Sequence, residues 1–315
     1  MKIAVLDAAT LGSDLDLSPL NEFGDVQIFR NTAPEDVADR IREADTVILN
    51  KVKLNESNLG QNHSVRQICI AATGYDNVDT AYCRSRGIAV CNVVGYSTNN
   101  VTQLTVSMVL YLINHLAEYT RDVRDGTYSH SGVANKLSPP YHEIAGKTWG
   151  IIGYGHIGKK VGEVARALGC RVIAFKRTPE KGTECVDLDT LCRESDIISV
   201  HLPLNESTKG IISAERIALM KKQVLFVNVA RGAVTDEKAL ADAISNNRIG
   251  GLGVDVYSRE PFGEDHPFYP IRENDNVCLT PHMAWGSIEA RERCLQEIVL
   301  NIRAFQAGER RSRVD

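Results

Sequence analysis

The sequence of 315 residues has no long uninterrupted apolar stretch, no cysteine cluster and no excess of basic charge. Its longest apolar run, residues 101–119, contains polar residues such as Gln103 and Asn114, so it predicts a buried helix rather than a membrane span. The eight cysteines form neither a C-x-x-C pair nor a Cys/His cluster at zinc spacing. This pattern predicts reduced, mostly buried thiols in a cytoplasmic protein without a bound metal.

Charge and composition narrow the class of protein further. The net charge is −4 and the pI is near 6.1, which gives no reason to expect nucleic acid or an anionic membrane as a partner. The opening residues 1–7 become acidic too soon for a secretory signal peptide, and they predict a first strand instead. A hydrophobic share of 43% allows substantial cores, and the length suits about two domains.

The first hundred residues alternate between strand and helix patterns. We expect strands at residues 3–6, 26–29, 46–49, 68–71 and 88–93. Helices are expected at 79–86 and at 32–44, where Thr32-Ala33-Pro34-Glu35 has the spacing of a capping box with a proline in the first turn. The pattern predicts a small parallel α/β domain.

A second α/β domain follows. A long helix is expected at 100–121, and then an irregular stretch, residues 125–143, predicts a connecting loop or an oligomer arm. Further strands are expected at 148–152, 171–175, 197–201, 224–229, 251–255 and 277–279, and an amphipathic helix at 288–307 precedes a loose tail, residues 309–315. We expect a first domain of residues 1–99 plus 286–315, with residues 100–285 inserted as the second.

The first strand and helix of the second domain frame the segment Gly153-Tyr154-Gly155-His156-Ile157-Gly158. G-x-G-x-x-G between a strand and a helix is the dinucleotide-binding fingerprint. Gly153 permits a tight turn, Gly155 lets the backbone approach a pyrophosphate, and Gly158 lets helix and strand pack closely. The N-terminus of the helix then favours the anionic pyrophosphate.

Polar side chains follow three later strands of the same domain. Arg231 follows the strand at 224–229, Asp255 and Glu260 follow the next, and His282 follows the last. An arginine can hold a substrate carboxylate and polarise a keto oxygen, and a histidine beside a carboxylate can transfer the hydroxyl proton. Each residue alone is more often structural, but together beside a nucleotide fingerprint they predict a site that reduces 2-keto acids.

Over nearly its whole length the sequence resembles the D-isomer-specific 2-hydroxyacid dehydrogenases. The resemblance rests on six ordered motifs: Ala72-Thr73-Gly74-Tyr75-Asp76-Asn77-Val78-Asp79, the fingerprint at Gly153, His201-Leu202-Pro203-Leu204, Asn228-Val229-Ala230-Arg231-Gly232, Asp255-Val256 with Glu260-Pro261, and Thr280-Pro281-His282. It implies a doubly wound Rossmann cofactor domain inserted into a flavodoxin-like substrate domain, and a homodimer formed through the long helix and arm.

The resemblance also implies roles for single residues. Arg231, Glu260 and His282 fall on the family's catalytic positions, and Thr73-Gly74 matches its substrate-carboxylate loop, with Lys51 and Val52 nearby. The further cofactor contacts that it implies come from His201, Leu202, Pro203, Thr208, Val229, Ala230 and Asp255, and Lys176, Arg177 and Thr178 stand at its ribose-binding position.

Within the family, the motifs at Ala72 and His282-Met283-Ala284-Trp285 are most similar to the branch of glycerate dehydrogenases and hydroxypyruvate or glyoxylate reductases. Two alternatives remain. Phosphoglycerate dehydrogenases have an arginine in the loop matched here by Ala71 to Gly74, and corepressors of the same fold, which sense dinucleotides, carry longer terminal extensions.

One departure from the family concerns the cofactor. NAD enzymes of the family place an acid about twenty residues beyond the fingerprint, where it holds the ribose hydroxyls. Lys176-Arg177-Thr178 occupies that place here. A solvated basic turn would explain these residues, but they also suit a 2′-phosphate, so we expect NADP(H) to be preferred over NAD(H).

Overall fold

The computed structural model describes residues 1–178 and 180–315, which form two compact units. One unit consists of Met1–Ser97 and Trp285–Asp315, and the other of Thr98–Ala284. The boundaries expected from the sequence lie after residues 99 and 285. Among the described residues, no helix has the length and apolar character needed to cross a membrane.

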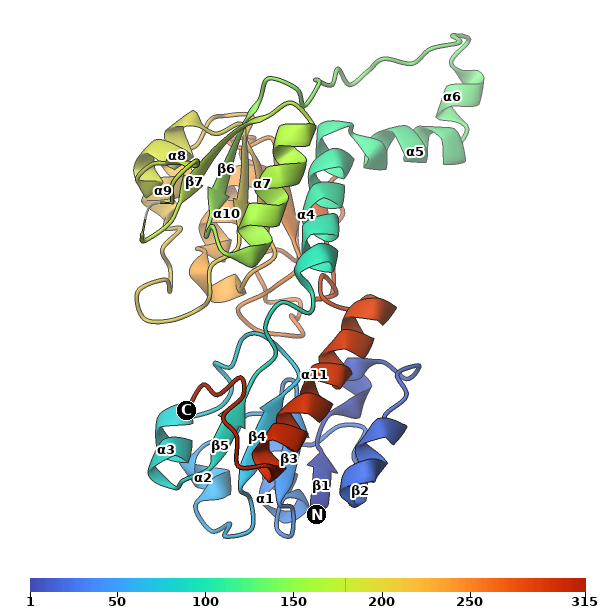
Figure 1. The fold of residues 1–315 in the computed structure, drawn as a ribbon. Helices are drawn as coiled ribbons and strands as arrows, with labels where there is room; N and C mark the ends of the chain where they lie inside the picture. Colours follow the sequence, from blue (N-terminus) through green and yellow to red (C-terminus); the bar gives the residue numbers. More distant parts are fainter. Residues whose placement is uncertain (179) are drawn as a thin grey trace. The chain divides into compact units, whose positions relative to one another are not determined.

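The first unit is a five-stranded parallel sheet with helices on both faces (Figure 1). Its strands are β1 (Lys2–Val5), β2 (Asp25–Ile28), β3 (Thr46–Leu49), β4 (Gln67–Ile70) and β5 (Ala89–Cys91). Its α-helices are α1 (Val37–Arg40), α2 (Glu56–Leu59), α3 (Thr80–Ser85) and α11 (Ile288–Gln306), and its 3-10 helices are η1 (Ala8–Leu11), η2 (Ser18–Phe23) and η3 (Pro34–Asp36).

The strand order is β2-β1-β3-β4-β5, the flavodoxin-like order of a doubly wound sheet. Alternate side chains of each strand enter different cores, because the side-chain period of a strand is two. In β1, Ile3 and Val5 pack with α11 and η2, whereas Ala4 packs with α1, α2 and α3 on the opposite face.

The second unit is a seven-stranded parallel sheet. Its strands are β6 (Thr148–Ile152), β7 (Arg171–Phe175), β8 (Glu184–Cys185), β9 (Ile197–Val200), β10 (Leu225–Asn228), β11 (Gly251–Val254) and β12 (Val277–Leu279). Its helices are α4 (Thr98–Ile113), α5 (Leu116–Arg124), α6 (Thr127–His130), α7 (His156–Ala167), α8 (Leu188–Glu194), α9 (Ala214–Leu219), α10 (Glu237–Ser245) and the 3-10 helix η4 (Gly232–Val234).

The order β12-β11-β10-β9-β6-β7-β8 is that of a Rossmann fold, which confirms the expected fold class. Helices α8, α9 and α10 share one large core with the sheet, and α4 packs beside α7 and against β10 and β11 (Figure 1). Glycines in β11 make room for α4, because a Cβ at Gly253 would lie 3.2 Å from Met108 and one at Gly251 would lie 3.4 Å from Leu112.

The single long helix expected at residues 100–121 is wrong. The structure has two helices, α4 and α5, separated at Asn114 and His115. His115 adopts the left-handed conformation with φ of 49°, which ends α4 and starts α5 in a new direction. The apolar pattern continues through this break, so the pattern alone did not reveal it.

The helix expected at residues 32–44 is much shorter than predicted. Only η3 and α1, which ends at Arg40, are helical there. The Thr32 hydroxyl donates a hydrogen bond to the Leu6 carbonyl instead of capping the helix. The expected capping box is therefore wrong.

The tail is ordered rather than loose. Residues 312–314 lie antiparallel to the edge strand β5, where the N–H of Val314 donates to the Val90 carbonyl at 2.9 Å and the N–H of Asn92 donates to Ser312 at 3.1 Å. Asp315 accepts the N–H of Val90 at 2.8 Å and pairs with Arg313, whose Nη2 lies 2.6 Å from Asp315 Oδ2. The tail thus adds a short sixth segment to the sheet.

This ion pair makes the stability of the first unit depend on pH. Burial alone would raise the pKa of Asp315, but the hydrogen bonds from Arg313 and from the Val90 N–H lower the pKa to about 2. Because a lowered carboxyl pKa stabilises the fold above the unfolded value, Asp315→Asn should lower the free energy of unfolding at neutral pH by about 2 kcal/mol.

Thermal unfolding as a function of pH measures this effect. The difference between Asp315→Asn and the wild type should shrink as the pH falls from about 4 toward about 2. Glu309→Gln, which changes an exposed acid of the same tail, is the matched control. A difference that stays constant down to the lowest pH would contradict the ion-pair explanation.

Candidate active site

Most of the predicted cofactor and catalytic residues follow strands of the second sheet at one edge. All seven strands are parallel, so their carboxyl ends lie at the same edge. The fingerprint follows β6, Lys176 follows β7, His201 follows β9 and Arg231 follows β10. Since the chain order reverses between β6 and β9, this edge is also the switch point where doubly wound sheets bind ligands.

The three glycines of the fingerprint have different surroundings. Gly153 has φ of 96°, and a Cβ there would lie 2.7 Å from the carbonyl carbon of His201. A Cβ at Gly158 would lie 2.2 Å from the Gly153 carbonyl oxygen, so helix and strand touch through backbone. Beside Gly155, in contrast, the space is open, and no side chain caps the N-terminus of α7. These features fit a bound pyrophosphate at this helix end.

His201, whose backbone adjoins Gly153, has a buried ring nitrogen without a partner among the described residues. The Trp149 Nε1–H donates to Ser199 Oγ at 2.9 Å, and Ser199 Oγ lies 3.0 Å from His201 Nε2. Burial lowers the pKa of His201 to about 3, so the ring is neutral and carries its proton on Nδ1 if Ser199 donates to Nε2. Nδ1 is buried and has no hydrogen-bond partner among the described residues, which suits a polar group of a ligand.

The basic segment after β7 is partly neutralised by an acid that the sequence did not single out. Glu180 pairs with Lys176 and, at 2.6 Å, with Lys159 of α7. Hydrogen bonds from Lys159 and then Lys176 lower the pKa of the Glu180 carboxyl. Arg177 and Thr178 are exposed. Of the three residues expected at a 2′-phosphate, Lys176 therefore already has an anionic partner within the chain.

The remaining predicted cofactor residues lie in the segments after β6, β9 and β10. The Thr208 hydroxyl donates to the Pro203 carbonyl at 2.6 Å, so it stabilises its own loop. The Tyr154 side chain is buried against α7, where Arg166 donates to its hydroxyl at 3.2 Å, which leaves its backbone for a ligand. Val229 is buried and Ala230 is half-buried.

Arg231 lies in a tight turn at the end of β10. Asn228 holds this turn, since its Nδ2 donates to the Arg231 carbonyl at 2.9 Å and its Oδ1 accepts the N–H of Ala230 at 3.0 Å. The next residue, Gly232, touches the loop after β11, because a Cβ there would lie 2.1 Å from the N of Ser258. The loop that carries Arg231 therefore packs through backbone against the loop that carries Glu260.

Glu260 and His282 form an ion pair or charged hydrogen bond. Glu260 Oε2 lies 2.7 Å from His282 Nδ1, while Glu260 Oε1 accepts the N–H of Tyr257 at 2.9 Å. His282 has φ of 54°, and its side chain is 18% exposed. The contact orients the imidazole and leaves Nε2 as the nitrogen that can exchange a proton with a substrate.

Asp255 fixes the segment that carries His282. Its buried carboxylate accepts the Thr280 hydroxyl at 2.6 Å and the N–H groups of Met283 and Ala284, both at 2.8 Å. Burial raises the pKa of Asp255 more than these hydrogen bonds lower it. The residue predicted to contact the cofactor thus binds the Thr280 side chain before His282 and the backbone after it.

In the first unit, the predicted substrate loops lie at the ends of neighbouring strands. The buried carboxylate of Asp7 accepts the N–H groups of Asn50 at 2.9 Å, Lys51 at 2.6 Å and Val52 at 3.1 Å. Asn77 Nδ2 also donates to the Val52 carbonyl at 2.9 Å, which joins the loop after β3 to the loop after β4.

Thr73 and Gly74 lie in this second loop. The Thr73 hydroxyl donates to the Val93 carbonyl at 2.8 Å, and Asn92 Nδ2 donates to the Thr73 carbonyl at 2.7 Å. Within the described residues, the N–H groups of Thr73 and Gly74 have no hydrogen-bond acceptor. Adjacent free amides of this kind can bind a carboxylate.

Several residues that shape these loops were not identified from the sequence, among them Asp7, Ser199 and Glu180. Asp7 and Ser199 had a detectable signal, because each lies in or just after a predicted buried strand, where a polar residue needs a partner. For Glu180 the sequence offered no signal beyond its charge.

Comparison with known proteins identifies the family of the chain. Residues 106–284 match the D-isomer specific 2-hydroxyacid dehydrogenase, NAD binding domain. The chain is 36% identical over 308 residues to a glycerate dehydrogenase of Methylorubrum extorquens, covering 98% of this chain and 96% of the relative. It is 34% identical to a hydroxypyruvate reductase of Blautia hydrogenotrophica, covering 98% of each chain.

Solved structures of similar proteins contain both nicotinamide cofactors. An acyclic imino acid reductase in complex with NADPH and D-Arg superposes with a TM-score of 0.89 at 29% identity, covering all of both chains. A D-lactate dehydrogenase of Aquifex aeolicus, complexed with NAD and lactic acid, has a TM-score of 0.87 at 27% identity and covers 98% of this chain and 96% of that one.

The chain belongs to the D-isomer specific 2-hydroxyacid dehydrogenase family. It is an oxidoreductase that uses a nicotinamide cofactor to interconvert small 2-hydroxy and 2-keto acids.

Proposed function

We propose that the chain reduces hydroxypyruvate and glyoxylate to the corresponding 2-hydroxy acids, with Arg231, Glu260 and His282 as catalytic residues. The observation that carries this proposal is the 2.7 Å contact between Glu260 and His282, at the same sheet edge as the dinucleotide fingerprint. The names of similar proteins, a glycerate dehydrogenase, hydroxypyruvate reductases and glyoxylate reductases, support the choice of substrates.

The residues divide the chemistry among them. The bound nicotinamide supplies the hydride. His282 donates a proton from Nε2 to the keto oxygen during reduction and takes it back during oxidation. The Glu260 carboxylate keeps Nδ1 as the hydrogen-bond donor and stabilises the positive ring that precedes proton transfer. Arg231 polarises the keto oxygen and binds the substrate carboxylate with two parallel hydrogen bonds.

The first unit also carries groups that can bind a carboxylate. These are the amides of Thr73 and Gly74, with Lys51 and Val52 in the neighbouring loop. Hydrogen bonds to Asp7 and from Asn77 fix the loop of Lys51 and Val52 before any ligand binds, so little ordering remains to oppose substrate binding.

A spectrophotometric panel tests the proposed substrates. Purified protein is assayed with NADPH and with NADH against glyoxylate, hydroxypyruvate, pyruvate, phenylpyruvate and 3-phosphohydroxypyruvate. We expect the highest kcat/KM with hydroxypyruvate or glyoxylate, because only small keto acids resemble the substrates named for its relatives. Preference for 3-phosphohydroxypyruvate would favour the phosphoglycerate dehydrogenase alternative, and no turnover with any acid would favour a binding protein.

Replacing the proton donor tests the assignment of His282. His282→Gln should lower kcat by about 10²-fold or more, because general acid catalysis contributes about that much. Dinucleotide affinity, followed by fluorescence titration, should persist because the fingerprint is unchanged. Turnover like that of the wild type would remove His282 from the mechanism.

We also propose that NADP(H) is preferred over NAD(H), with Arg177 as the main contact of the 2′-phosphate. Arg177 is exposed after β7, and none of the three described residues 176–178 is an acid that would repel a phosphate. Lys176 and Lys159 contribute less, because Glu180 pairs with both of them. One similar structure contains NADPH and another contains NAD, so these structures do not decide which cofactor is preferred.

Two variants separate these contributions. Arg177→Ala should weaken NADPH binding about tenfold and leave NADH nearly unchanged, because one charge-assisted hydrogen bond contributes about 1.5–3 kcal/mol. Glu180→Gln should instead strengthen NADPH binding, because it frees Lys159 and Lys176. Equal losses for both cofactors in Arg177→Ala, or a wild type that uses NADH more efficiently, would contradict the proposal.

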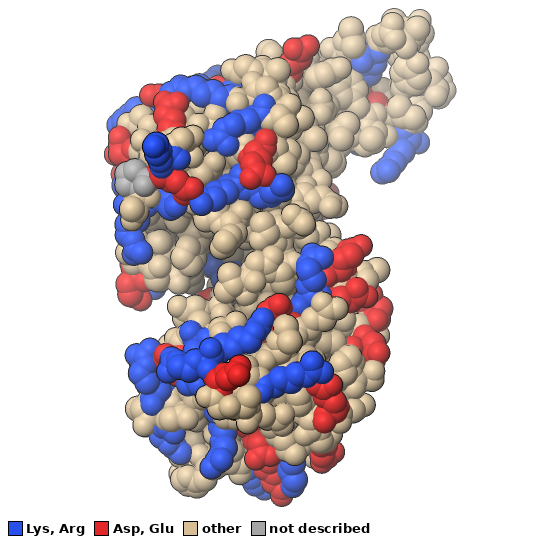
Figure 2. All heavy atoms as spheres, in the orientation of Figure 1, with Lys and Arg blue, Asp and Glu red and all other residues tan. Residues whose placement is uncertain are grey.

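We further propose that two copies associate through the arm formed by α5, α6 and residues 131–141. This arm exposes large apolar side chains, and in Figure 2 most of its visible surface is neither acidic nor basic. The exposed residues are Leu116, Val123, Tyr128, Val133, Leu137 and Tyr141. Sedimentation velocity measures the assembly.

The eight unpaired cysteines suit a reducing cytoplasm, which thiol titration of protein from intact cells would check.

A further inference from the structure

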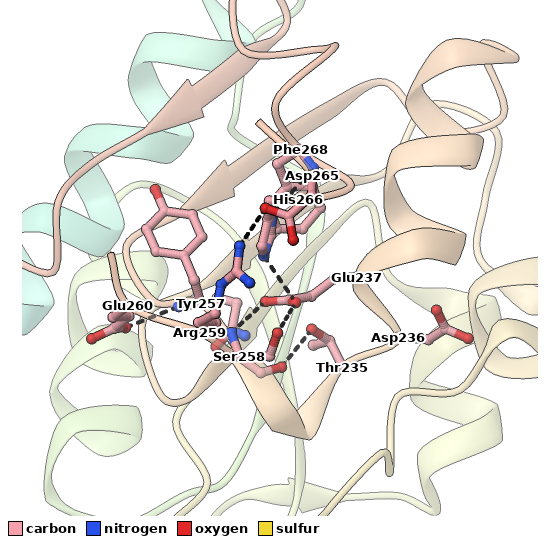
Figure 3. A network of polar contacts seen from close by, with 12 residues as sticks. Thr235, Asp236, Glu237, Tyr257, Ser258, Arg259, Glu260, Asp265, His266 and Phe268 are labelled. Atoms are coloured by element: carbon pink, nitrogen blue, oxygen red, sulfur yellow. Dashed lines mark hydrogen bonds and ion pairs between the residues drawn. The ribbon is translucent and has the colours of Figure 1, made fainter. Parts of the chain in front are cut away.

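A buried polar network lies behind the loop that carries Glu260 (Figure 3). Its centre is Glu237, the first residue of α10, which is 8% exposed. Glu237 Oε1 accepts the N–H of Ser258 at 2.8 Å, and Oε2 accepts the Ser258 hydroxyl and lies 3.1 Å from His266 Nε2. A buried carboxylate needs several donors, and this one has three.

The contact at His266 Nδ1 shows which ring nitrogen carries the proton. The N–H of Phe268 donates to His266 Nδ1 at 3.2 Å, so Nδ1 carries no proton and Nε2–H donates to Glu237. The ring is also enclosed by Tyr257 and Phe262, with centroids 5.7 Å and 4.9 Å away. Glu237 therefore accepts a hydrogen bond from His266 Nε2–H, whose position is fixed. The carboxylate cannot rotate without losing this hydrogen bond.

The network is connected to Glu260 through the backbone of Tyr257, which joins two consecutive peptide units. The N–H of Ser258 points to Glu237, whereas the N–H of the preceding residue, Tyr257, donates to Glu260 Oε1 at 2.9 Å. Gly232 packs directly against the same peptide, since a Cβ there would lie 2.1 Å from the carbonyl carbon of Tyr257. A shift of this peptide would move the Glu260 carboxylate and the turn after Arg231 together.

We propose that Glu237, locked by His266, is a positioning residue for Glu260. It holds the Tyr257–Ser258 peptide, and through the Tyr257 backbone the N–H that Glu260 accepts, so that the Glu260 carboxylate meets His282. This inference rests on the proposed roles of Glu260 and His282. It assigns no contact with substrate to Glu237.

A double-mutant cycle tests the proposal. In Glu237→Gln, no orientation of the amide can accept all three donors, because its NH₂ group must face either Ser258 N–H or His266 Nε2–H. The peptide should shift, and kcat should fall about tenfold to a hundredfold, since small misplacements of catalytic groups have effects of this size. Dinucleotide affinity should stay near that of the wild type.

The double variant Glu237→Gln/Glu260→Gln decides between positioning and general destabilisation. If Glu237 acts through Glu260, kcat of the double variant should equal that of Glu260→Gln alone, because the positioned group is already gone. If the losses of kcat in the two single variants multiply in the double variant, the proposal is overturned. His266→Phe, alone and with Glu260→Gln, repeats the cycle if Glu237→Gln does not fold, and we expect the same non-additivity.

Two further comparisons complete the experiment. Arg259→Ala removes an exposed ion pair with Asp265 in the same loop and should leave kcat within about twofold. If Glu260→Gln alone leaves kcat unchanged, the proposed role of Glu260 fails and the inference fails with it. If Glu260→Gln is impaired but Glu237→Gln and His266→Phe are both as active as the wild type, only the positioning role is overturned.

Discussion

The need of buried carboxylates for hydrogen-bond donors shapes the functional loops of both units. Removing an ionised carboxylate from water is costly unless several donors surround it. Asp7, Glu237 and Asp255 are each buried, and each accepts backbone N–H groups from a loop at the end of a neighbouring strand. Three irregular loops thereby acquire defined positions without forming regular secondary structure.

This arrangement explains how a rigid site can be built from loops. A parallel sheet fixes only where each strand ends, and the following residues would otherwise sample many conformations. Asp255 reaches across to the loop after β12, and Glu237 reaches from α10 to the loop after β11. Each carboxylate joins two different crossovers, so the side chains proposed as catalytic are preorganised relative to one another, as electrostatic catalysis requires.

The sequence predicted the regular part of the fold well. Strands β3, β6, β7 and β12 have the predicted bounds, because short apolar runs between turn residues identify buried parallel strands. The fingerprint glycines were informative because backbone geometry restricts which residue can stand at a positive φ or at a close backbone contact, as at Gly153 and Gly158.

The sequence predicted less where distant residues meet. The break at His115 and the pairing of residues 312–314 with β5 depend on tertiary contacts that local periodicity does not record. The partners of Glu237, namely Ser258 and His266, lie 21 and 29 residues away along the chain. Arg231, Glu260 and His282 could be predicted as candidates because each follows a strand, but the groups that orient them could not.

The ordered tail also bears on how the protein can be handled. An edge strand with unpaired N–H and C=O groups is a template for association with other chains. Along β5, the Val90 carbonyl accepts the N–H of Val314, and the N–H of Asn92 donates to the Ser312 carbonyl. Arg313 places a charge beside these hydrogen bonds. A truncation that removes Ser312 and the residues after it would uncover this edge and promote aggregation. An affinity tag attached at the amino terminus leaves the edge protected.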